Sequence, residues 1–384
     1  MATEFRAGRY IRQPNHYAAF MPSPLPPNPA LQWDDELQTL LSRADRALGR
    51  LDGSIQTLPD LFVFMYVRKE AVLSSQIEGT QSSLNDLLEA EAAISDAYRP
   101  SDVGEVLNYV SAMNHGLERL ASFPLSVRLI REIHALLLEN VRGNQASPGE
   151  IRRSQNWIGP GGCGIVDAIF VPPPPHAVET LLSDLEKFIH SASPIPPLVK
   201  IGLIHAQFET IHPFLDGNGR IGRLLITFFL CQSEILLKPV LYLSHYFKAN
   251  RTEYYELLQA VRDRGAWEEW IKFFLHGVAT VSLEATETAR AIVTLRERHR
   301  RLITDSFGRA AGNGLRILES LYQRPYLTVN QVKDYLGISF QSASELVRRM
   351  VDADLLSEIT GQDRYRVYQY TPYVWVFSEP GRAG

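Results

Sequence analysis

A glycine-containing loop in the middle of the chain, leading directly into an apolar segment, limits the possible folds more than any other feature. Residues 217–219 read Gly-Asn-Gly, and the stretch from Ile221 to Leu230 is mostly apolar. Glycine has no Cβ, so the backbone N–H groups of such a loop stay accessible, and the apolar run predicts a helix. Loop N–H groups that lead into a helix N-terminus form an anion site, because the helix dipole favours negative charge there.

Helical periodicity dominates the rest of the first three quarters of the chain. Apolar residues recur at three- and four-residue steps from Leu37 to Leu48, after a helix start at Trp33-Asp34-Asp35. Ser83 is expected to open another helix. The remaining helices are expected over residues 60–78, 101–121, 125–141, 177–191 and 196–211. The fold class predicted from this pattern is mainly α.

Two segments depart from the helical pattern. Residues 1–32 are rich in proline, and we expect an irregular, extended arm on the surface. Residues 155–175 combine glycines with short β-branched runs and end in four prolines, which predicts a β-hairpin inserted in a helical domain. Inserted segments of this kind carry function more often than they support a core.

The last 80 or so residues have a pattern of their own. Helices are expected over Leu315–Tyr322, from Thr328 onward and over Phe340–Asp352, followed by a hairpin of Leu355–Ile359 and Arg364–Tyr370. Helices followed by a hairpin in this order predict a winged helix-turn-helix domain. Residues 301–384 contain 10 basic and 9 acidic residues, so a DNA-binding role for them is uncertain. Recruitment of a target or dimerisation is at least as well supported.

Charge and composition narrow the cellular setting. The net charge is −4 and only two cysteines occur, which argues against a disulfide framework and against a general attraction to nucleic acid. The N-terminal residues lack the basic and apolar run of a signal peptide, and no stretch is apolar enough to span a bilayer. We therefore expect a cytoplasmic protein that does not bind membranes.

The segment His212-Pro-Phe-Leu-Asp-Gly-Asn-Gly-Arg-Ile-Gly-Arg223 gathers several chemical groups around the predicted anion site. His212 can act as a base at neutral pH. Asp216 offers the hard oxygen ligand that Mg²⁺ prefers. Arg220 and Arg223 lie three residues apart, so they share one helix face and can both reach phosphates. A base, a metal ligand, an anion site and two arginines together point to phosphoryl or nucleotidyl transfer.

These twelve residues resemble the signature of the Fic family, HxFx(D/E)GNGRxxR, at every specified position. Ser74-Ser-Gln-Ile-Glu78-Gly79 resembles the inhibitory motif of the family, (S/T)xxxE(G/N), and Gly79 is a natural helix stop. The expected hairpin at 155–175 resembles the family's flap, and the resemblance extends over roughly residues 25–280. It implies a Fic-type helical bundle with a β-hairpin flap.

The resemblance also implies a division into three parts. Residues 1–100 would form the N-terminal arm and a helical region with the inhibitory motif. Residues 101–295 would form the Fic catalytic core. Residues 300–384 would form the winged helix-turn-helix domain.

Fic enzymes typically move AMP from ATP to a Ser, Thr or Tyr hydroxyl of a target protein, and the resemblance carries these roles to the matching residues. His212 would take the proton of the attacking hydroxyl, and Phe214 would pack under the loop. Asp216 would hold Mg²⁺ at the phosphates. Arg220 would bind the departing diphosphate, and Arg223 would grip the γ-phosphate. The nucleotide site would also include Asn218 and its neighbours in the motif, Gly217, Gly219, Ile221 and Gly222.

The inhibitory motif would act electrostatically in the resting enzyme. Glu78 would pair with Arg223, occupy its guanidinium and repel the γ-phosphate, so that ATP would not bind productively. We expect Glu78→Gly to release this inhibition and His212→Ala to abolish transfer. Ser74 and Gly79 complete the motif.

The resemblance leaves the nucleoside pocket less defined. Tyr254 and Tyr255 are candidates to line it, and at most one of them can stack on the base because adjacent helical residues point about 100° apart. Ile169 and Phe170 of the flap are candidates to contact nucleotide or target. His205 and His245 are expected to be core or surface residues rather than ligands.

Three functions from different classes remain open in the sequence. The first is an autoinhibited protein adenylyltransferase whose target docks on the 155–175 flap, with the chain itself as a possible target and a homodimer as a possible assembly. The second is removal of AMP from a modified protein by the same site. The third is a nucleotide-sensing DNA-binding regulator. The sequence does not distinguish adenine from guanine in the donor.

Overall fold

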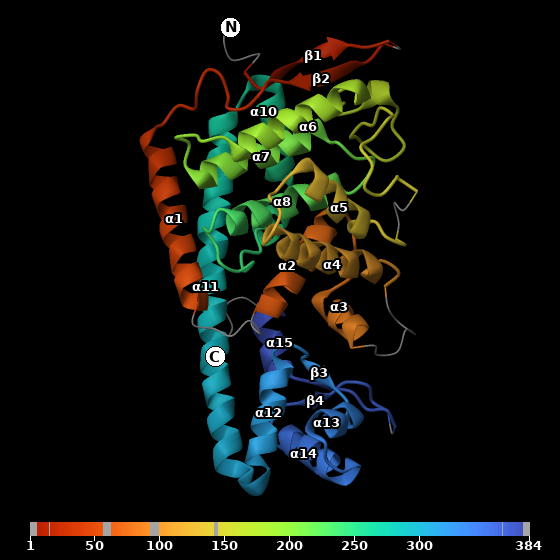
Figure 1. Cartoon of the computed structure of the whole chain (residues 1–384), viewed down its shortest axis with the longest axis vertical. Coiled ribbons are helices and arrows are strands. Elements are labelled where there is room, and N and C mark those ends of the chain that lie inside the picture. Colours follow the sequence, from red (N-terminus) through yellow and green to blue (C-terminus); the bar gives the residue numbers. More distant parts are fainter. Residues whose placement is uncertain are drawn as a thin grey trace.

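The computed structural model describes residues 6–14, 16–56, 63–92, 100–141, 145–362 and 364–378, and it is mainly helical. The predicted fold class is therefore confirmed. Figure 1 shows a helical bundle above, a small β-hairpin at its upper end and a separate group of shorter elements below. Among the described residues, no helix has both the length and the apolar character that crossing a bilayer requires.

The first half of the chain begins with a short hairpin and continues with helices near their predicted positions. Its elements are β1 (Gly8–Arg12), β2 (Ala18–Pro22), α1 (Asp35–Gln56), α2 (Val63–Ile77), α3 (Leu84–Glu91), α4 (Val103–Leu120), α5 (Val127–Leu137), a 3-10 turn (Ile165–Asp167) and α6 (Pro175–His190). Ser83 caps α3 as expected, because its hydroxyl accepts from the Asp86 N–H and its own N–H donates to the Asp86 carboxylate. The start of the helix predicted from residue 60 lies outside the described residues.

The core is built on two helices that follow one another in sequence, α7 (Pro197–Ile211) and α8 (Asn218–Gln232). Every residue of α7 from Leu198 to Ile211 is buried, as expected for a helix surrounded by protein on all sides. Asn218 begins α8, so the loop between the two helices carries the predicted catalytic segment. The loop is therefore held between two buried helices.

The elements that follow pack around this pair. They are α9 (Ser244–Ala249), α10 (Arg251–Arg264) and the long helix α11 (Trp267–Ser306), which lies along α1 in Figure 1. Trp270 of α11 donates its indole N–H to the Gly202 carbonyl of α7 at 2.8 Å. Helix α11 runs without interruption across residues 295–300, where the boundary of the catalytic core was expected.

The C-terminal elements have the order expected for a winged helix. They are a 3-10 turn (Gly308–Ala310), α12 (Ala311–Leu321), β3 (Tyr326–Leu327), α13 (Val329–Leu336), α14 (Phe340–Asp352), β4 (Ser357–Glu358), β5 (Tyr368–Gln369) and α15 (Thr371–Ser378). The strands form an antiparallel sheet in the order β3-β5-β4. Thr328 caps α13, where a helix is expected to begin, and Gly337 ends that helix in the left-handed conformation at φ 67°. This arrangement is compatible with a winged helix-turn-helix.

The helix that would enter a DNA groove, α14, offers little free positive charge. Arg348 pairs with Glu345 at 2.8 Å and with Asp352 at 3.0 Å. Arg349 pairs with the same Glu345 at 3.1 Å. DNA binding depends on cations that can neutralise phosphates. These pairs therefore weaken the DNA-binding hypothesis for residues 301–384.

The N-terminal arm differs from the prediction, because β1 and β2 form an antiparallel pair within it rather than an irregular segment. Gly8 pairs with Pro22 and Arg12 with Ala18 in an antiparallel register. Phe20 is 1% exposed, and its N–H donates to the Val171 carbonyl at 2.9 Å. The partner of this hairpin thus lies about 150 residues away, and local proline content could not indicate it.

The flap is also smaller than the predicted hairpin. Only Ile158 and Phe170 form a bridged pair, with N–H to O distances of 2.8 and 3.1 Å, and Ile165–Asp167 form a 3-10 turn instead of a strand. In an antiparallel ladder the next hydrogen-bonded positions lie two residues away on each strand, at Pro160 on one side and Pro172 on the other. Proline has no N–H to donate, so the ladder stops after one pair.

Helix α15 packs against the N-terminal part of α2, directly below it in Figure 1. The rings of Phe377 and Tyr66 meet edge to face with centroids 5.2 Å apart, and Phe377 is 2% exposed. Phe377→Ala is expected to lower the free energy of unfolding by about 3–5 kcal/mol, through lost burial and the cavity left behind. Chemical denaturation measures this change. Trp375→Ala on the same helix is the control, because Trp375 is 54% exposed and its loss should cost about 0.5 kcal/mol or less.

Candidate active site

The loop between α7 and α8 takes its shape from two left-handed residues. His212 ends α7 at φ 50° and ψ 61°, and Gly217 precedes α8 at φ 78°. Glycine adopts this conformation without cost, whereas a histidine needs support from its surroundings. Because the first N–H groups of a helix have no acceptor within the helix, residues 218–220 present donors at the start of α8. These backbone N–H groups are the donors that the predicted anion site requires.

Aromatic packing holds this loop from below. Phe214 is fully buried, and its ring stacks on His134 of α5 with centroids 3.7 Å apart and planes 7° from parallel. His134 accepts a hydrogen bond from the Gly149 N–H at 2.8 Å, and its other ring nitrogen lies 3.0 Å from the Asp216 carbonyl oxygen. The packing role predicted for Phe214 agrees with this geometry.

The side chain of Asn218 closes the loop. Its amide oxygen accepts from the Phe214 N–H at 2.9 Å, and its amide nitrogen donates to the Phe214 carbonyl at 2.8 Å. The amide oxygen and one of the two amide hydrogens are therefore engaged within the loop. The sequence places Asn218 in the nucleotide site, and its backbone N–H is one of the donors at the start of α8.

The remaining motif residues fall into two groups. A Cβ at Gly219 would collide with Oε1 of Glu78, and one at Gly222 would collide with Oε1 of Glu209, so a side chain at either position would displace a carboxylate. Ile221 is 1% exposed and belongs to the core. Its side chain therefore supports α8 and does not face a nucleotide.

The imidazole of His212 is neutral at physiological pH. Burial lowers its pKa to about 3, with further lowering by the positive charges of Arg262 and Arg152. Arg152 also donates to the His212 carbonyl at 2.8 Å. A neutral imidazole can accept a proton, which is the state a general base requires.

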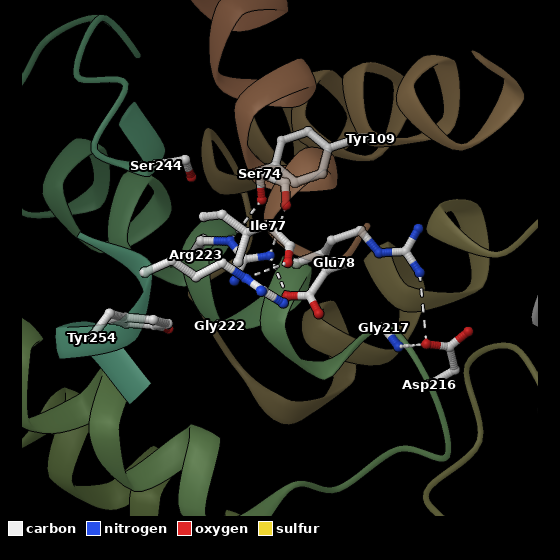
Figure 2. Close-up of polar contacts among 12 residues, drawn as sticks. Ser74, Ile77, Glu78, Tyr109, Asp216, Gly217, Gly222, Arg223, Ser244 and Tyr254 are labelled. Atoms are coloured by element: carbon white, nitrogen blue, oxygen red, sulfur yellow. Dashed lines mark hydrogen bonds and ion pairs between the residues drawn. The ribbon is translucent and has the colours of Figure 1, made fainter. Parts of the chain in front are cut away.

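Arg223 is held by the predicted inhibitory motif. Its Nε donates to the Ser74 hydroxyl at 2.8 Å and its Nη2 to the Ser74 carbonyl at 3.0 Å. The same Nη2 donates to Oε1 of Glu78 at 2.7 Å. Figure 2 shows Ser74, Glu78 and Arg223 in one cluster at the end of α2. The ion pair predicted from the sequence is therefore present.

The Glu78 carboxylate lies against the start of α8, where the backbone anion site opens. Burial alone would raise the pKa of Glu78, but the charge and hydrogen bond of Arg223, with a contribution from Arg220, hold this pKa below its ordinary value. Glu78 is thus ionised at neutral pH. Gly79 follows at φ 99°, the left-handed conformation expected for a residue that ends a helix.

Asp216 lies on the other side of the loop, at the right of Figure 2, and Arg220 lies 3.8 Å from it. Arg220 is 2% exposed and pairs with the buried Glu105 of α4 at 3.1 Å. Asp216 accepts from the Gly217 N–H at 2.7 Å and lies 3.8 Å from Arg220, with its side chain 44% exposed.

The described residues contain no group of three or more His, Cys, Asp and Glu side chains that could hold a metal ion. Mg²⁺ does not need such a group when it sits at phosphates, because one or two carboxylates, water and the phosphate oxygens complete its coordination. The half-exposed carboxylate of Asp216 beside an anion site fits that donor set.

The two candidate tyrosines lie in different environments. Tyr254 is 1% exposed, and its hydroxyl is hydrogen-bonded to Nε2 of His205 at 2.8 Å, within an aromatic cluster around Trp270. Tyr255 is 40% exposed, and the guanidinium of Arg251 lies 5.4 Å from its ring centroid. Tyr255 is therefore the one of the two whose ring a ligand can reach from solvent, while Tyr254 and His205 belong to the core.

The two candidate residues of the flap differ in their exposure to solvent. Ile169 is 64% exposed, as a contact to a docked segment requires. Phe170 is 1% exposed and lies beneath the Arg262 guanidinium at 3.8 Å. Its side chain anchors the flap to the body of the protein and cannot touch a target.

Three buried residues outside the motifs complete the site, and sequence reasoning missed them. They are Glu105, which pairs with Arg220, His134, which stacks on Phe214, and Arg152, which bonds to the His212 backbone. None belongs to a recognisable pattern. The one available signal was a charged residue or histidine on an otherwise apolar helix face, which describes Glu105 and His134.

Family profiles match most of the region that carries this geometry. The profile described as Fic/DOC family N-terminal matches residues 38–118, and the profile described as Fic/DOC family matches residues 124–230. The chain belongs to the Fic family. The N-terminal match includes Ser74 and Glu78, and the second match includes His212 and Arg223, so both halves of the ion pair lie in Fic segments.

Curated relatives share parts of this Fic chain. A probable protein adenylyltransferase of Aquifex aeolicus is 39% identical over 72 residues, 19% of this chain and 22% of that protein. The protein adenylyltransferase Fic of Aedes aegypti is 31% identical over 205 residues, and that of Drosophila yakuba is 27% identical over 235 residues. These matches cover 51% and 59% of this chain and 37% and 43% of the relatives. The chain thus spans less than half the length of these relatives.

One solved structure resembles the chain over most of its length. A Fic family protein from Desulfovibrio desulfuricans G20 superposes with a TM-score of 0.59 at 18% identity, covering 88% of this chain and 97% of that one. At this level of identity the likeness concerns the fold.

Proposed function

We propose that this chain is an autoinhibited protein adenylyltransferase, which transfers AMP from ATP to a Ser, Thr or Tyr hydroxyl of a target protein. The observation that carries the proposal is the ion pair of Glu78 with Arg223, formed against Gly219 at the start of α8. It puts a carboxylate where the loop offers donors to phosphate. The names of the curated relatives support the same reaction.

The proposed reaction uses the groups of the loop in sequence. The target hydroxyl attacks the α-phosphorus, neutral His212 accepts its proton, and the bond to the β-phosphate oxygen breaks to release diphosphate. Arg223 and Arg220, with the N–H groups at the start of α8, hold the phosphates for in-line displacement. Asp216 would hold Mg²⁺, which supplies further neutralisation of phosphate charge.

The test compares two positions of the radioactive label. The Glu78→Gly variant is incubated with Mg²⁺ and ATP labelled at either the α- or the γ-phosphate, alone and with bacterial lysate. The proposal expects protein-bound label from the α-phosphate only, because AMP retains that phosphate and diphosphate leaves with the other two. Label from the γ-phosphate would indicate a kinase, and no label from either would contradict the proposed donor.

Removal of AMP is the second candidate, and the ionised state of Glu78 favours it. A carboxylate beside His212 could orient a water molecule for attack on an AMP-modified protein. Protein labelled by Glu78→Gly is the substrate for this test. Loss of its label on addition of the wild-type chain, but not of Glu78→Gly/His212→Ala, would establish this activity.

A further inference from the structure

Arg152 joins the flap to the candidate base through a buried guanidinium. The residue is 3% exposed, and its side chain donates to the carbonyls of His212 at 2.8 Å, Ile211 at 3.4 Å, Pro173 at 2.6 Å and Ser154 at 3.4 Å. Ser154 lies just before the flap and Pro173 is near its end. One side chain therefore links both arms of the flap to the end of α7.

The end of α7 needs such a partner. The last carbonyls of a helix have no donors within the helix, and a cation is favoured there by the helix dipole. His212 also adopts a left-handed conformation that is uncommon for histidine and persists only when neighbours enforce it. Arg152 supplies two donors and a positive charge at this point.

The segment around Arg152 follows the catalytic loop for several residues. The Arg152 N–H donates to the Pro213 carbonyl at 3.0 Å, and the Asn156 amide donates to the Phe214 carbonyl at 2.9 Å. Gln155 closes the two arms of the flap by donating to the Pro172 carbonyl at 2.9 Å. Residues 152–156 thus lie beside residues 212–214 as a continuous support.

We propose that Arg152 is a positioning residue that locks the base of the flap to the backbone of His212, so that the target-binding segment and the candidate base form one rigid unit. This inference rests on the proposed function, because it assigns target docking to the flap and proton transfer to His212. A docked hydroxyl would then meet the imidazole at a fixed separation, whichever target supplies it.

The positive charge of Arg152 also favours the neutral state of the His212 imidazole. Within the described part of the chain, every hydrogen bond of its guanidinium goes to a backbone carbonyl, so no carboxylate cancels its charge. Around His212 the other titratable groups are Arg262 of α10, Glu78 just after α2, and Glu209 one turn earlier on α7. Arg152 and Arg262 both favour the neutral imidazole.

The test uses Glu78→Gly as the active reference and adds one arginine substitution at a time. Arg152→Gln removes the charge and most of the donors, and Arg152→Lys keeps the charge with fewer donors. Arg131→Gln is the matched control, because Arg131 donates to the neighbouring Gly149 carbonyl at 2.8 Å but does not touch His212. The measurements are the maximal rate of labelling from α-labelled ATP, the KM for ATP and the thermal midpoint.

A misplacement of the base by about 1 Å can cost about 100-fold in rate. We therefore expect Arg152→Gln to lower the maximal rate by about 100-fold with the KM for ATP within about 3-fold, since Arg152 does not line the phosphate site. The maximal rate of Arg152→Lys should lie between those of the reference and Arg152→Gln. The maximal rate of Arg131→Gln should match that of the reference. A general loss of structure would change KM and rate together. A fall of less than about 10-fold, an equal fall in Arg131→Gln or an effect on KM alone would overturn the proposal.

A second measurement does not depend on activity. Hydrogen exchange should rise together in peptides of the flap and of residues 212–217 in Arg152→Gln, and in neither for Arg131→Gln. Faster exchange in one segment only would refute the lock even if no label is transferred, and absence of label in Glu78→Gly itself would refute the proposed function alone. If Arg152→Gln does not fold, Arg152→Lys provides the test. A labelling rate and a hydrogen exchange equal to those of the reference in that variant would overturn the proposal.

Discussion

Glu78→Gly is expected to raise the transfer of AMP by at least about 100-fold over the wild-type chain. The Glu78 carboxylate lies 2.7 Å from Arg223 and against Gly219, so it both occupies the arginine and faces any phosphate that enters. Two unit charges 4 Å apart interact by about 4 kcal/mol at an effective dielectric constant of 20, and each 1.4 kcal/mol is tenfold. The Glu78 side chain is 32% exposed, so solvent screening weakens this interaction. We therefore set the expected increase at about 100-fold or more, below what 4 kcal/mol would give.

The measurement is the initial rate of labelling from α-labelled ATP at equal protein concentrations. Glu78→Gln separates charge from shape, because it keeps the volume of the side chain and removes its charge. If repulsion dominates, Glu78→Gln should recover most of the increase, and if obstruction dominates, it should stay near the wild type. Equal rates for the wild type and Glu78→Gly would show that this ion pair does not restrain the reaction.

The sequence predicted the parts of the site that lie in continuous segments. Gly79 adopts the left-handed conformation expected of it, and Glu78 meets Arg223 although 145 residues separate the two. This second prediction depended on two recognisable motifs, since nothing in the local pattern of either segment indicates that they touch. The resulting contact is observed, while its inhibitory effect stays a prediction.

Side-chain roles within the motif were harder to predict than the motif itself. Asn218 turns its amide onto the Phe214 backbone, and Tyr254 turns its hydroxyl onto His205. In both cases the side chain makes a hydrogen bond inside the protein that the motif does not indicate. Spacing along a helix fixes the direction of a side chain, but the partner it meets there depends on the packing of other helices.

Long-range pairing explains the other differences. The N-terminal hairpin rests on the flap through Phe20, and the flap keeps a single bridged pair because Pro160 and Pro172 interrupt its ladder. The prolines were visible in the sequence, but their effect depends on a register that only the folded chain defines. Arg152 was equally visible, and its importance follows from three carbonyls that two distant segments contribute, at Pro173 and at Ile211 and His212.

His212→Ala in the Glu78→Gly background is expected to lower labelling by about 10²–10⁴-fold, the usual contribution of general acid–base catalysis. His276→Ala is the control, because His276 is exposed on α11 and its ring faces Tyr246 rather than the loop. Label that persists in His212→Ala at the reference rate would remove His212 from the reaction.

The pH dependence tests the same residue without removing it. The active form of a general base is deprotonated, and the pKa of His212 is lowered to about 3 by burial and by the charges of Arg262 and Arg152. Loss of activity by protonation therefore begins only near that pKa, well below the range where an ordinary histidine titrates. Removal of Glu78, whose negative charge raises the pKa of His212, moves the pH at which activity is lost further down.

At low ATP concentration, where the rate reports the free enzyme, labelling by Glu78→Gly should stay level from pH 8 to about pH 5. A tenfold fall between pH 7 and pH 5.5 would contradict the lowered pKa of His212.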